Sequence, residues 1–448
     1  MRRYLAIDLG AESGRVILGT IDDDNLVLEE LHRFPNTPVR LPDGFYWDVL
    51  RLWHEVKQGL SVAGRGRKLT IDGVGVCTWG VDFALLTRDG SLAANPRHYR
   101  DARNNGMVER TTAIVSRERI YEETGVQFMQ INSLCQLHAA KLANDPGLAI
   151  ANKLLFMPDL FAYWLSGVAK AEQTIASTSQ FYNPRTGTWA TEIIHAFGLP
   201  AHILPEIVPA GTLLGTLRPE LAIETGLSAE TRIYATAGHD TAAAVAAVPA
   251  TRDKPWCYIS SGTWSLMGVE LDAPVVNEQA LAHNFTNEVG AGGKIRFLKN
   301  IMGLWPLQEC RRQWQAEGLN LSYTELAAQA AAEPEFPAII DIDQFLEPGD
   351  MPRRIAAAAN PAPKTPAQYT RLILQSLAKR YNDVLQSLES LTNQRIEVIH
   401  IVGGGSQNVL LNQFVAETTK REVIAGPAEA TAEGNIRTQA LGARTLGP

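Results

Sequence analysis

Carboxylates beside small residues are the first places where this sequence could do chemistry. Segment 8–15 reads DLGAESGR and joins two apolar runs. Backbone N–H groups of such a loop can bind phosphate oxygens. Asp8, at the end of the first run, can hold a magnesium ion that bridges to the phosphate, and Arg15 would add positive charge to the same anion. The alternative is an ordinary β-hairpin whose glycines serve only its turn.

Two further loops combine glycine with hydroxyl or amide side chains. Segment 260–265 reads SSGTWS, and segment 401–408 reads IVGGGSQN, in which an apolar run enters three glycines. Glycine lets a ligand lie directly against the backbone because it has no Cβ. The second loop matches neither GxGxxG nor GxxxxGK[ST], so a nucleotide bound there would use another geometry. The alternatives are a polar turn around a packed tryptophan and glycines that merely start a helix.

Two segments could act on a substrate that carries hydroxyl groups. In GHDT (238–241), Asp240 precedes an alanine-rich run. The dipole of a helix there favours the ionised carboxylate as a proton acceptor, and a plain N-cap is the alternative. In TWGVDF (78–83), a tryptophan beside a glycine and a carboxylate is typical of sugar sites. Core packing of Trp79 and Phe83 explains this segment equally well.

The pattern of apolar residues predicts the elements that must position these segments. Strands are expected at 4–9, 15–21, 26–34 and 71–77, and a helix capped by Asp48 should run to about Ala63. Residues 83–86 should form a hairpin over the turn at 89–90. Region 102–226 has a helical pattern interrupted by prolines, and we expect it to be an insertion that covers the first sheet.

The second half of the chain starts in a similar way. Strands are expected at 256–260, 264–270 and 397–402, helices at 304–317 and 366–391, and a linker or exposed loop at 356–366. Each half therefore begins with a strand, a short Gly/Ser loop and a second strand. This weak internal repeat indicates a duplicated fold with a cleft between its halves.

Composition excludes several classes of protein. At roughly 150 residues per domain, 448 residues predict two or three domains. A hydrophobic content of 45% with 20% charged residues excludes global disorder, and the net charge of −7 lacks the basic footprint of a nucleic-acid partner. The four cysteines have no CxxC spacing, no HxxxH, HExxH or GxSxG pattern occurs, and no signal-like or membrane-spanning apolar run is present. We therefore expect a soluble, cytoplasmic protein without a protein-caged zinc site, a serine-hydrolase centre or a membrane partner.

In this order, and together with KNIMGLW at 299–305, these segments resemble the FGGY family of carbohydrate kinases. The resemblance runs from Tyr4 to about Ile436 and is strongest to members that act on L-rhamnulose. It implies an α/β fold of two ribonuclease H-like domains of the actin/hexokinase-like ATPase type, flanking a cleft. The sugar-binding domain would be 1–243 and the nucleotide-binding domain 244–448. It also implies phosphorylation of the 1-hydroxyl of L-rhamnulose by ATP with Mg²⁺ in L-rhamnose catabolism.

The resemblance assigns roles to individual residues. Asp240 would be the catalytic base, and Asp8 a ligand of magnesium. The residues expected to contact ATP are Ala11, Glu12, Ser13, Gly14, Arg15, Thr263, Gln308, Gly404 and Gly405. Those expected to contact the sugar are Gly80, Asp82, His239, Asp240, Thr241 and Asn300. The partners would be a small ketose and ATP, and the chain would be a monomer or a weak homodimer.

Two alternatives and one departure accompany this interpretation. Another FGGY kinase, for L-fuculose or D-xylulose, needs only one or two altered residues. A non-catalytic sugar or nucleotide sensor is the other alternative, although the His-Asp-Thr setting of Asp240 argues against it. The departure is that Arg437 stands where the family usually has glycine, and the chain stops at Pro448. We therefore expect a second domain shortened at its end.

Overall fold

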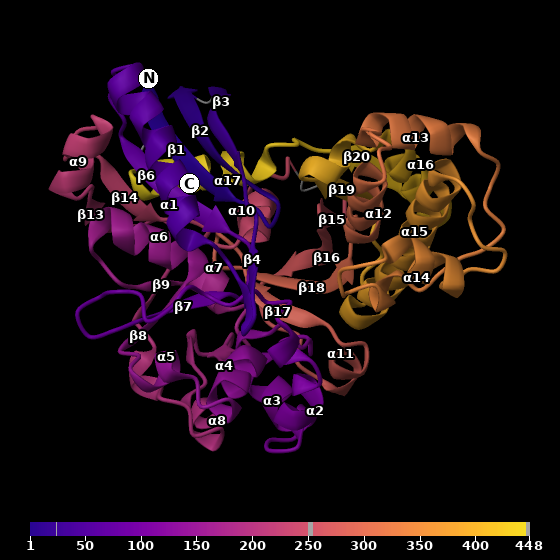
Figure 1. The fold of residues 1–448 in the computed structure, drawn as a ribbon, viewed down its shortest axis with the longest axis horizontal. Coiled ribbons are helices and arrows are strands. Elements are labelled where there is room, and N and C mark those ends of the chain that lie inside the picture. The colour runs from indigo at the N-terminus through magenta and orange to yellow at the C-terminus, as the bar shows by residue number, and fades with distance from the viewer. Residues whose placement is uncertain (24, 250–253, 445–448) are drawn as a thin grey trace. The chain divides into compact units, whose positions relative to one another are not determined.

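A computed structural model describes residues 1–23, 25–249 and 254–444 (Figure 1). The chain divides into two units. Unit 1 contains Met1–Ala247, Glu270–Phe297 and the chain from Thr431 on, and unit 2 contains Val248–Val269 and Leu298–Ala430. The first break lies close to the expected boundary at 243/244, but the C-terminal segment and residues 270–297 group with unit 1.

A six-stranded sheet forms the frame of unit 1. Its strand order is β13-β14-β6-β1-β2-β3. The bounds are β13 (Thr212–Thr216), β14 (Arg232–Ala235), β6 (Gly73–Thr78), β1 (Arg2–Leu9), β2 (Ser13–Asp22) and β3 (Asn25–Pro35). Strands β1, β2 and β3 form an antiparallel meander, whereas β6 is parallel to β1, and β14 is parallel to β6. The carboxyl ends of β1, β6 and β14 therefore meet at one edge.

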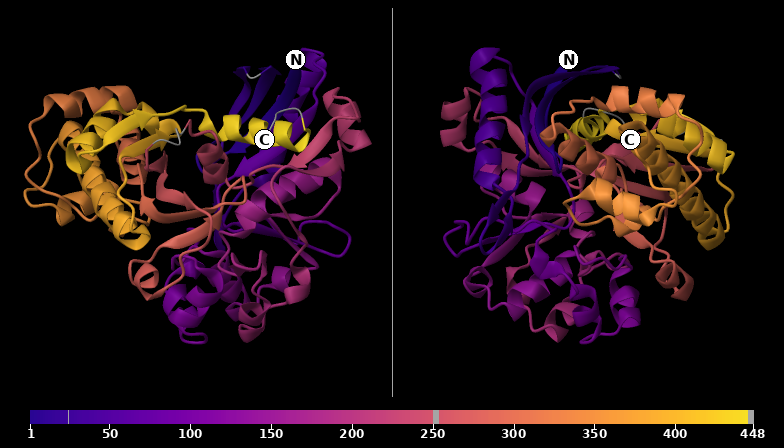
Figure 2. Two further views of the ribbon diagram at one scale, coloured as in Figure 1. Left: turned by 180° about the vertical axis from the view of Figure 1, so that it is seen from behind. Right: turned by 45° about the vertical axis from the view of Figure 1, so that its right-hand side comes forward.

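Helices cover both faces of this sheet because its central strands are apolar on both sides. On one face, Tyr4 and Ile17 pack in one core cluster with Ile436 of α17 (Ala430–Gly442). Figure 2 shows α17 in yellow on this sheet. On the other face lies α1 (Val49–Ser61), where a Cβ at Gly59 would overlap Val16. Asp48 caps α1 as predicted, because its side chain accepts a hydrogen bond from the Arg51 N–H.

Short helices and two-stranded ribbons make up the rest of unit 1. The helices are α2 (Met107–Thr112), α3 (Arg117–Thr124), α4 (Ser133–Leu142), α5 (Pro146–Ala149), α6 (Met157–Ser166), α7 (Gln173–Ala176), α8 (Thr191–Ala196), α9 (Pro219–Thr225), α10 (Asp240–Ala246) and α11 (Glu278–Ala282). The ribbons pair β4 (Val39–Leu41) with β5 (Gly44–Tyr46), β7 (Phe83–Leu86) with β8 (Lys153–Phe156), β9 (Ala171–Glu172) with β12 (Ile207–Val208) and β10 (Tyr182–Asn183) with β11 (Thr188–Trp189).

A second six-stranded sheet has the order β17-β18-β16-β15-β19-β20. Its strands are β17 (Thr286–Val289), β18 (Ile295–Met302), β16 (Trp264–Leu271), β15 (Trp256–Ser261), β19 (Val398–Val402) and β20 (Glu422–Ala425). Strand β15 is antiparallel to β16 and parallel to β19. The same pattern relates β1 to β2 and β6, so the predicted repeat of strand, loop and strand is confirmed.

The α-helices of unit 2 range from 8 to 27 residues in length. They are α12 (Trp305–Ala316), α13 (Tyr323–Ala332), α14 (Met351–Ala358), α15 (Pro366–Thr392) and α16 (Val409–Thr419). Helix α15 presents a row of buried apolar residues, among them Leu377, Tyr381 and Leu388. Apolar residues recurring every three or four positions explain why its bounds could be predicted to within a residue.

Several expected elements differ from those observed. The turn after β7 forms, with the Thr87 N–H donating to the Ser91 carbonyl, but β7 pairs mainly with the distant β8. The loop predicted at 356–366 starts later than expected, because α14 continues to Ala358. Region 102–226 is largely helical, yet it also contains β13, an edge strand of the first sheet.

Two findings concern the whole described chain. Within the described residues, no helix is long and apolar enough to cross a membrane. All four cysteines lie among those residues, and each is buried as a free thiol.

Candidate functional site

Asp240 is the first residue of α10, directly after the segment that leaves the sheet edge at β14. Two neighbours fix the backbone before it. The Glu172 carboxylate accepts the Gly238 N–H at 2.9 Å, and the Thr174 hydroxyl accepts the His239 N–H at 3.2 Å. Burial raises the pKa of the Asp240 carboxyl, His239 opposes this rise, and the charge of Asp8 adds to it. The carboxylate is thus held as a proton acceptor that is more basic than an exposed aspartate.

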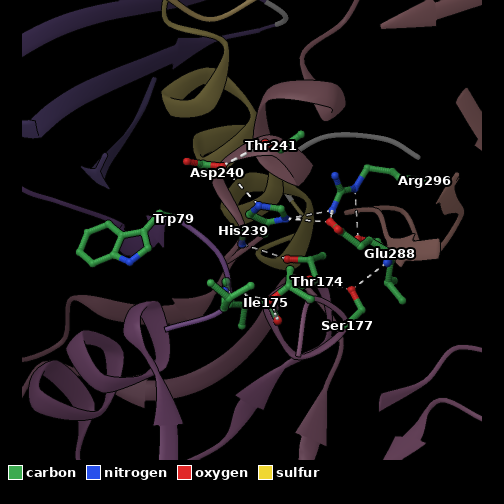
Figure 3. Close-up of polar contacts among 12 residues, drawn as sticks. Trp79, Thr174, Ile175, Ser177, His239, Asp240, Thr241, Glu288 and Arg296 are labelled. Atoms are coloured by element: carbon green, nitrogen blue, oxygen red, sulfur yellow. Dashed lines mark hydrogen bonds and ion pairs between the residues drawn. The ribbon is translucent and has the colours of Figure 1, made fainter. Parts of the chain in front are cut away.

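His239 lies between Asp240 and a buried carboxylate (Figure 3). Its Nε2 atom is 3.5 Å from Oδ1 of Asp240, and its Nδ1 atom is 3.2 Å from Oε2 of Glu288. Thr241 donates its hydroxyl to Asp240 Oδ1 at 3.1 Å. Gly80 lies on the Nε2 side, because a Cβ there would be 3.3 Å from that nitrogen. The predicted sugar contacts Gly80, His239 and Thr241 are therefore brought together around Asp240.

Asp8 lies one residue before the end of β1 and pairs with Arg15, the third residue of β2. An Arg15 guanidinium nitrogen donates to Asp8 Oδ2 at 2.5 Å, so this charge is directed at the carboxylate. The turn between them is tight: the Gly10 N–H donates to the Ser13 carbonyl at 2.9 Å, and Asn36 Nδ2 donates to the Gly10 carbonyl. Ala11 and Glu12 form the tip of this turn, and Gly14 pairs with Leu9.

Asp82 has a different setting from the other predicted sugar contacts. It is completely buried, and its carboxylate accepts hydrogen bonds from the indole N–H groups of Trp47 and Trp79, the backbone N–H of Tyr99 and the amide of Gln136. Burial raises its pKa to about 6, against these hydrogen bonds. Its acceptors are therefore occupied by protein donors that orient two tryptophans.

In unit 2, the two Gly/Ser loops lie against each other. Gly403 has φ +83°, and a Cβ at Gly405 would overlap the Ser261 hydroxyl, whereas a Cβ at Gly404 would meet nothing within 4 Å. The start of α12 joins them, because the Trp305 N–H donates to the Thr263 carbonyl at 3.2 Å. This loop cluster offers a backbone surface that only glycine leaves open.

Gln308 lies one turn into α12, the helix whose start is joined to this loop cluster by the Trp305 N–H. Its Oε1 atom is buried, and no group in the described part of the chain donates a hydrogen bond to it. A buried carbonyl oxygen of this kind needs a partner. Asn300 lies on β18, in the part of that strand that belongs to unit 2.

Sequence reasoning missed four residues that surround Asp240: Glu172, Thr174, Glu288 and Arg296. The first two occur in no motif that signals chemistry. Arg296, however, is fully buried in the apolar strand β18. A charged residue within an apolar strand pattern was a signal, because arginine is almost never fully buried unless it is paired.

The comparisons with known proteins agree with this layout. The N-terminal domain model of the FGGY family of carbohydrate kinases matches residues 3–247, and the C-terminal domain model matches residues 257–443. A rhamnulokinase of Bacteroides thetaiotaomicron is 45% identical, with 98% of this chain and 90% of the relative covered. A rhamnulokinase of Oceanobacillus iheyensis is 40% identical, covering 98% of this chain and 92% of the relative.

Solved structures share the fold at much lower identity. A ligand-bound xylulose kinase from Lactobacillus acidophilus has a TM-score of 0.80 at 13% identity and covers 100% of this chain and 91% of that one. Plasmodium falciparum glycerol kinase with ADP has a TM-score of 0.77 at 14% identity and covers 100% of this chain and 91% of that one. The predicted fold class, two α/β domains of the actin/hexokinase-like ATPase type, is confirmed.

Proposed function

Because this chain belongs to the FGGY family of carbohydrate kinases, we propose that it transfers the γ-phosphoryl group of ATP to the 1-hydroxyl of L-rhamnulose. The products would be L-rhamnulose 1-phosphate and ADP, formed in the cytoplasm during L-rhamnose catabolism. The choice of sugar rests on relatives named rhamnulokinase at 38–45% identity over nearly the whole chain. The observation that carries the chemistry is Asp240, a carboxylate of raised basicity fixed at the start of α10.

Asp240 would act as the general base. As the bond between the 1-hydroxyl oxygen and phosphorus forms, this oxygen becomes acidic, and a carboxylate within hydrogen-bond reach accepts its proton. Thr241 holds the carboxylate by a hydrogen bond, and the His239 ring lies beside it, with Nε2 3.5 Å from Asp240 Oδ1. The protein needs little covalent participation, since phosphoryl transfer depends mainly on positioning and on neutralising charge.

The loop cluster of unit 2 fits a nucleotide. Its glycines leave the backbone open to a ligand, and a Cβ at Gly405 would narrow that space. The buried Oε1 atom of Gln308 could accept a hydrogen bond from an exocyclic amine or a hydroxyl of the nucleotide. Thr263, Gln308, Gly404 and Gly405 would hold ATP, and Ala11 to Arg15 would border its phosphates. Asn300 remains a predicted sugar contact.

The acidic residues fit magnesium only in part. Within the described residues, no group of three His, Cys, Asp or Glu side chains forms a ready cage. Magnesium usually takes one or two carboxylates and completes its shell with phosphates and water, so Asp8 alone suffices as a protein ligand. When bound with ATP, magnesium would supply positive charge to the phosphate oxygens.

We assign Asp82 a supporting role in place of the direct sugar contact that the sequence predicted. Its carboxylate already accepts four hydrogen bonds from the protein. It would act by orienting Trp79, which precedes Gly80 and whose ring centroid lies 4.0 Å from that of the tilted Trp47 ring. The tryptophan, not the carboxylate, would then border the sugar.

A panel of three ketoses and one polyol tests the proposal. The purified protein with Mg-ATP is assayed for ADP release with L-rhamnulose, L-fuculose, D-xylulose and glycerol, and the product is identified by ³¹P NMR. We expect the highest kcat/KM with L-rhamnulose and a 1-phosphate ester as product. A higher kcat/KM with another ketose would show that L-rhamnulose is not the preferred substrate, while the proposed kinase activity would stand. ATP binding without turnover of any sugar would instead support a sensor.

A further inference from the structure

We propose that Glu288, together with Arg296, is a positioning residue of this kinase: it fixes the proton of His239 on Nδ1 and so leaves Nε2, beside the catalytic carboxylate, free to accept a hydrogen bond from a hydroxyl of the sugar. This inference rests on the proposed function of Asp240 as the base. It concerns two residues of the hairpin β17–β18 that no sequence motif singled out.

Charged side chains lie on both sides of the His239 ring (Figure 3). Glu288 Oε2 lies 3.2 Å from His239 Nδ1 and 3.0 Å from an Arg296 guanidinium nitrogen, which is itself 3.1 Å from Nδ1. On the opposite side of the ring, Nε2 lies 3.5 Å from Asp240 Oδ1. One carboxylate thus meets each nitrogen of the imidazole.

The chemistry of these partners decides which nitrogen carries the proton. Burial raises the pKa of Glu288, but the hydrogen bond with His239 and the charge of Arg296 outweigh it, so the net shift is downward and the group is ionised. An ionised carboxylate can only accept, and a hydrogen bond from Nδ1–H to it is charge-assisted. Arg296 then donates to Glu288 rather than to the ring. Nε2 of this tautomer carries a lone pair, so beside Asp240 and Gly80 it can accept a hydrogen bond from a substrate hydroxyl and cannot donate one to the carboxylate.

The surroundings hold this pair in place from a second side. The Ser177 hydroxyl accepts the Val289 N–H at 2.9 Å, and Arg296 Nε donates to the Val289 carbonyl at 3.3 Å. Ser177 follows α7, whose start holds the backbone of Gly238 and His239. The side chain and the backbone of His239 are therefore anchored by two elements that also contact each other.

Stability alone does not account for such a pair. Glu288 and Arg296 are 4% and 0% exposed, and a buried ion pair is often no more stabilising than well-packed apolar residues of the same volume. A role in orienting the His239 ring beside Asp240 explains why the protein keeps these two buried charges. Second-layer carboxylates orient histidines in the same way at metal centres.

The first test locates the ring proton of His239 directly and does not depend on catalytic activity. Long-range ¹H–¹⁵N spectra of the full-length ¹⁵N-labelled protein report the tautomer of each histidine, and the signal of His239 is assigned by its loss in His239→Gln. We expect a protonated Nδ1 in the wild type. In Glu288→Gln the amide can donate to Nδ1, so the proton should move to Nε2. An unchanged His239 signature in Glu288→Gln would overturn the proposal.

The second test is kinetic and uses the ketose with the highest turnover. Glu288→Gln should lower kcat at least tenfold and change the KM for ATP less than twofold, and Glu288→Asp should recover part of kcat because it restores the charge. Glu270→Gln is the matched control, since Glu270 also lies near the charge of Arg296 but not on His239. Equal losses in Glu270→Gln and Glu288→Gln would contradict positioning.

A double variant covers the case in which Glu288→Gln fails to fold around the unpaired Arg296. E288Q/R296M removes both buried charges and should fold, lose the Nδ1 proton and keep the low kcat. Wild-type kcat in this folded double variant would overturn the proposal. If the wild type itself turns over no ketose, the proposed function fails, whereas the tautomer experiment still decides whether Glu288 places the proton.

Discussion

The Arg15 guanidinium donates a hydrogen bond to Asp8 Oδ2 over 2.5 Å, across directly paired positions of β1 and β2. Both side chains are largely buried, so the pair is poorly screened by solvent. The charge of Asp8 in turn raises the pKa of Asp240. Arg15 therefore acts on the proposed base through an intermediate carboxylate.

Replacing Arg15 by glutamine should shift the pH dependence of catalysis. Without the guanidinium, more of the negative charge of Asp8 acts on Asp240, so the pKa of Asp240 rises further. A base must be ionised to work, and the acid limb of kcat/KM should move to higher pH by up to about one unit. The measurement is a profile from about pH 5 to about pH 9 at saturating ATP. Arg33→Gln, which removes an exposed partner of Glu30, should leave the limb in place.

Replacing Asp240 by asparagine should abolish most turnover while sugar binding persists. The amide keeps the shape and one acceptor oxygen but cannot take a proton, so kcat should fall by about 10²- to 10⁴-fold. Coupled ADP assays give kcat, and calorimetry gives the affinity for the sugar. Asp48→Asn is a suitable control because asparagine caps a helix as well as aspartate does. A near-normal kcat in Asp240→Asn would show that Asp240 is not the catalytic base.

Adding a methyl group at Gly80 should obstruct the sugar. The new Cβ would lie 3.3 Å from His239 Nε2 and 3.4 Å from Thr178 Cγ2. Overpacking of about 1–3 kcal/mol corresponds to a rise of roughly 5- to 150-fold in the KM for the ketose. Initial rates at varied ketose give this value, and the KM for ATP should stay constant. Gly292→Ala, where a Cβ meets nothing within 4 Å, is the control.

Asp82 should make stability depend on pH. Its pKa is about 6 in the folded state against 3.8 for the ordinary group, so between these values the native state binds more protons than the unfolded state. The free energy of unfolding should therefore fall as pH rises through this window, by at most about 1.4 kcal/mol per unit, and then level off. Urea unfolding of the wild type and Asp82→Asn, followed by tryptophan fluorescence, measures the difference. Parallel curves for the two proteins between pH 4 and pH 8 would show that Asp82 does not titrate there.

Two adjacent glycines of the unit 2 loop cluster should respond differently to alanine. A Cβ at Gly405 would overlap the Ser261 hydroxyl and lie 2.9 Å from its carbonyl oxygen, whereas Gly404 faces open space. Gly405→Ala should thus lower the free energy of unfolding by about 1–3 kcal/mol, and Gly404→Ala should not. Thermal unfolding by calorimetry compares them. Equal unfolding temperatures for both variants would contradict the packing described for this loop cluster.

The sequence allowed the fold to be predicted where local patterns are strong. Apolar periodicity located β1, β2, α12 and α15 to within a few residues. It placed β7 in a local hairpin but did not identify β8 as its main partner, because no local pattern records a pairing across a long stretch of chain. For the same reason it assigned β13 to a helical insertion.

The candidate site shows the same limit. Motifs marked Asp240, His239 and Gly80, which the fold brings together. They did not mark Glu288 and Arg296, which reach His239 only through the pairing of β17 with β18. A motif also could not show that the acceptors of Asp82 are occupied by protein donors, since Trp47 and Gln136 come from elsewhere in the chain.

The packing of α17 against the first sheet has a consequence during synthesis. Tyr4 and Ile17 emerge from the ribosome long before Ile436 and Ala440, which complete their core cluster. These contacts on one apolar face of β1 and β2 therefore cannot form until α17 has been translated. Contacts this far apart in sequence form slowly, and exposed apolar strands invite aggregation.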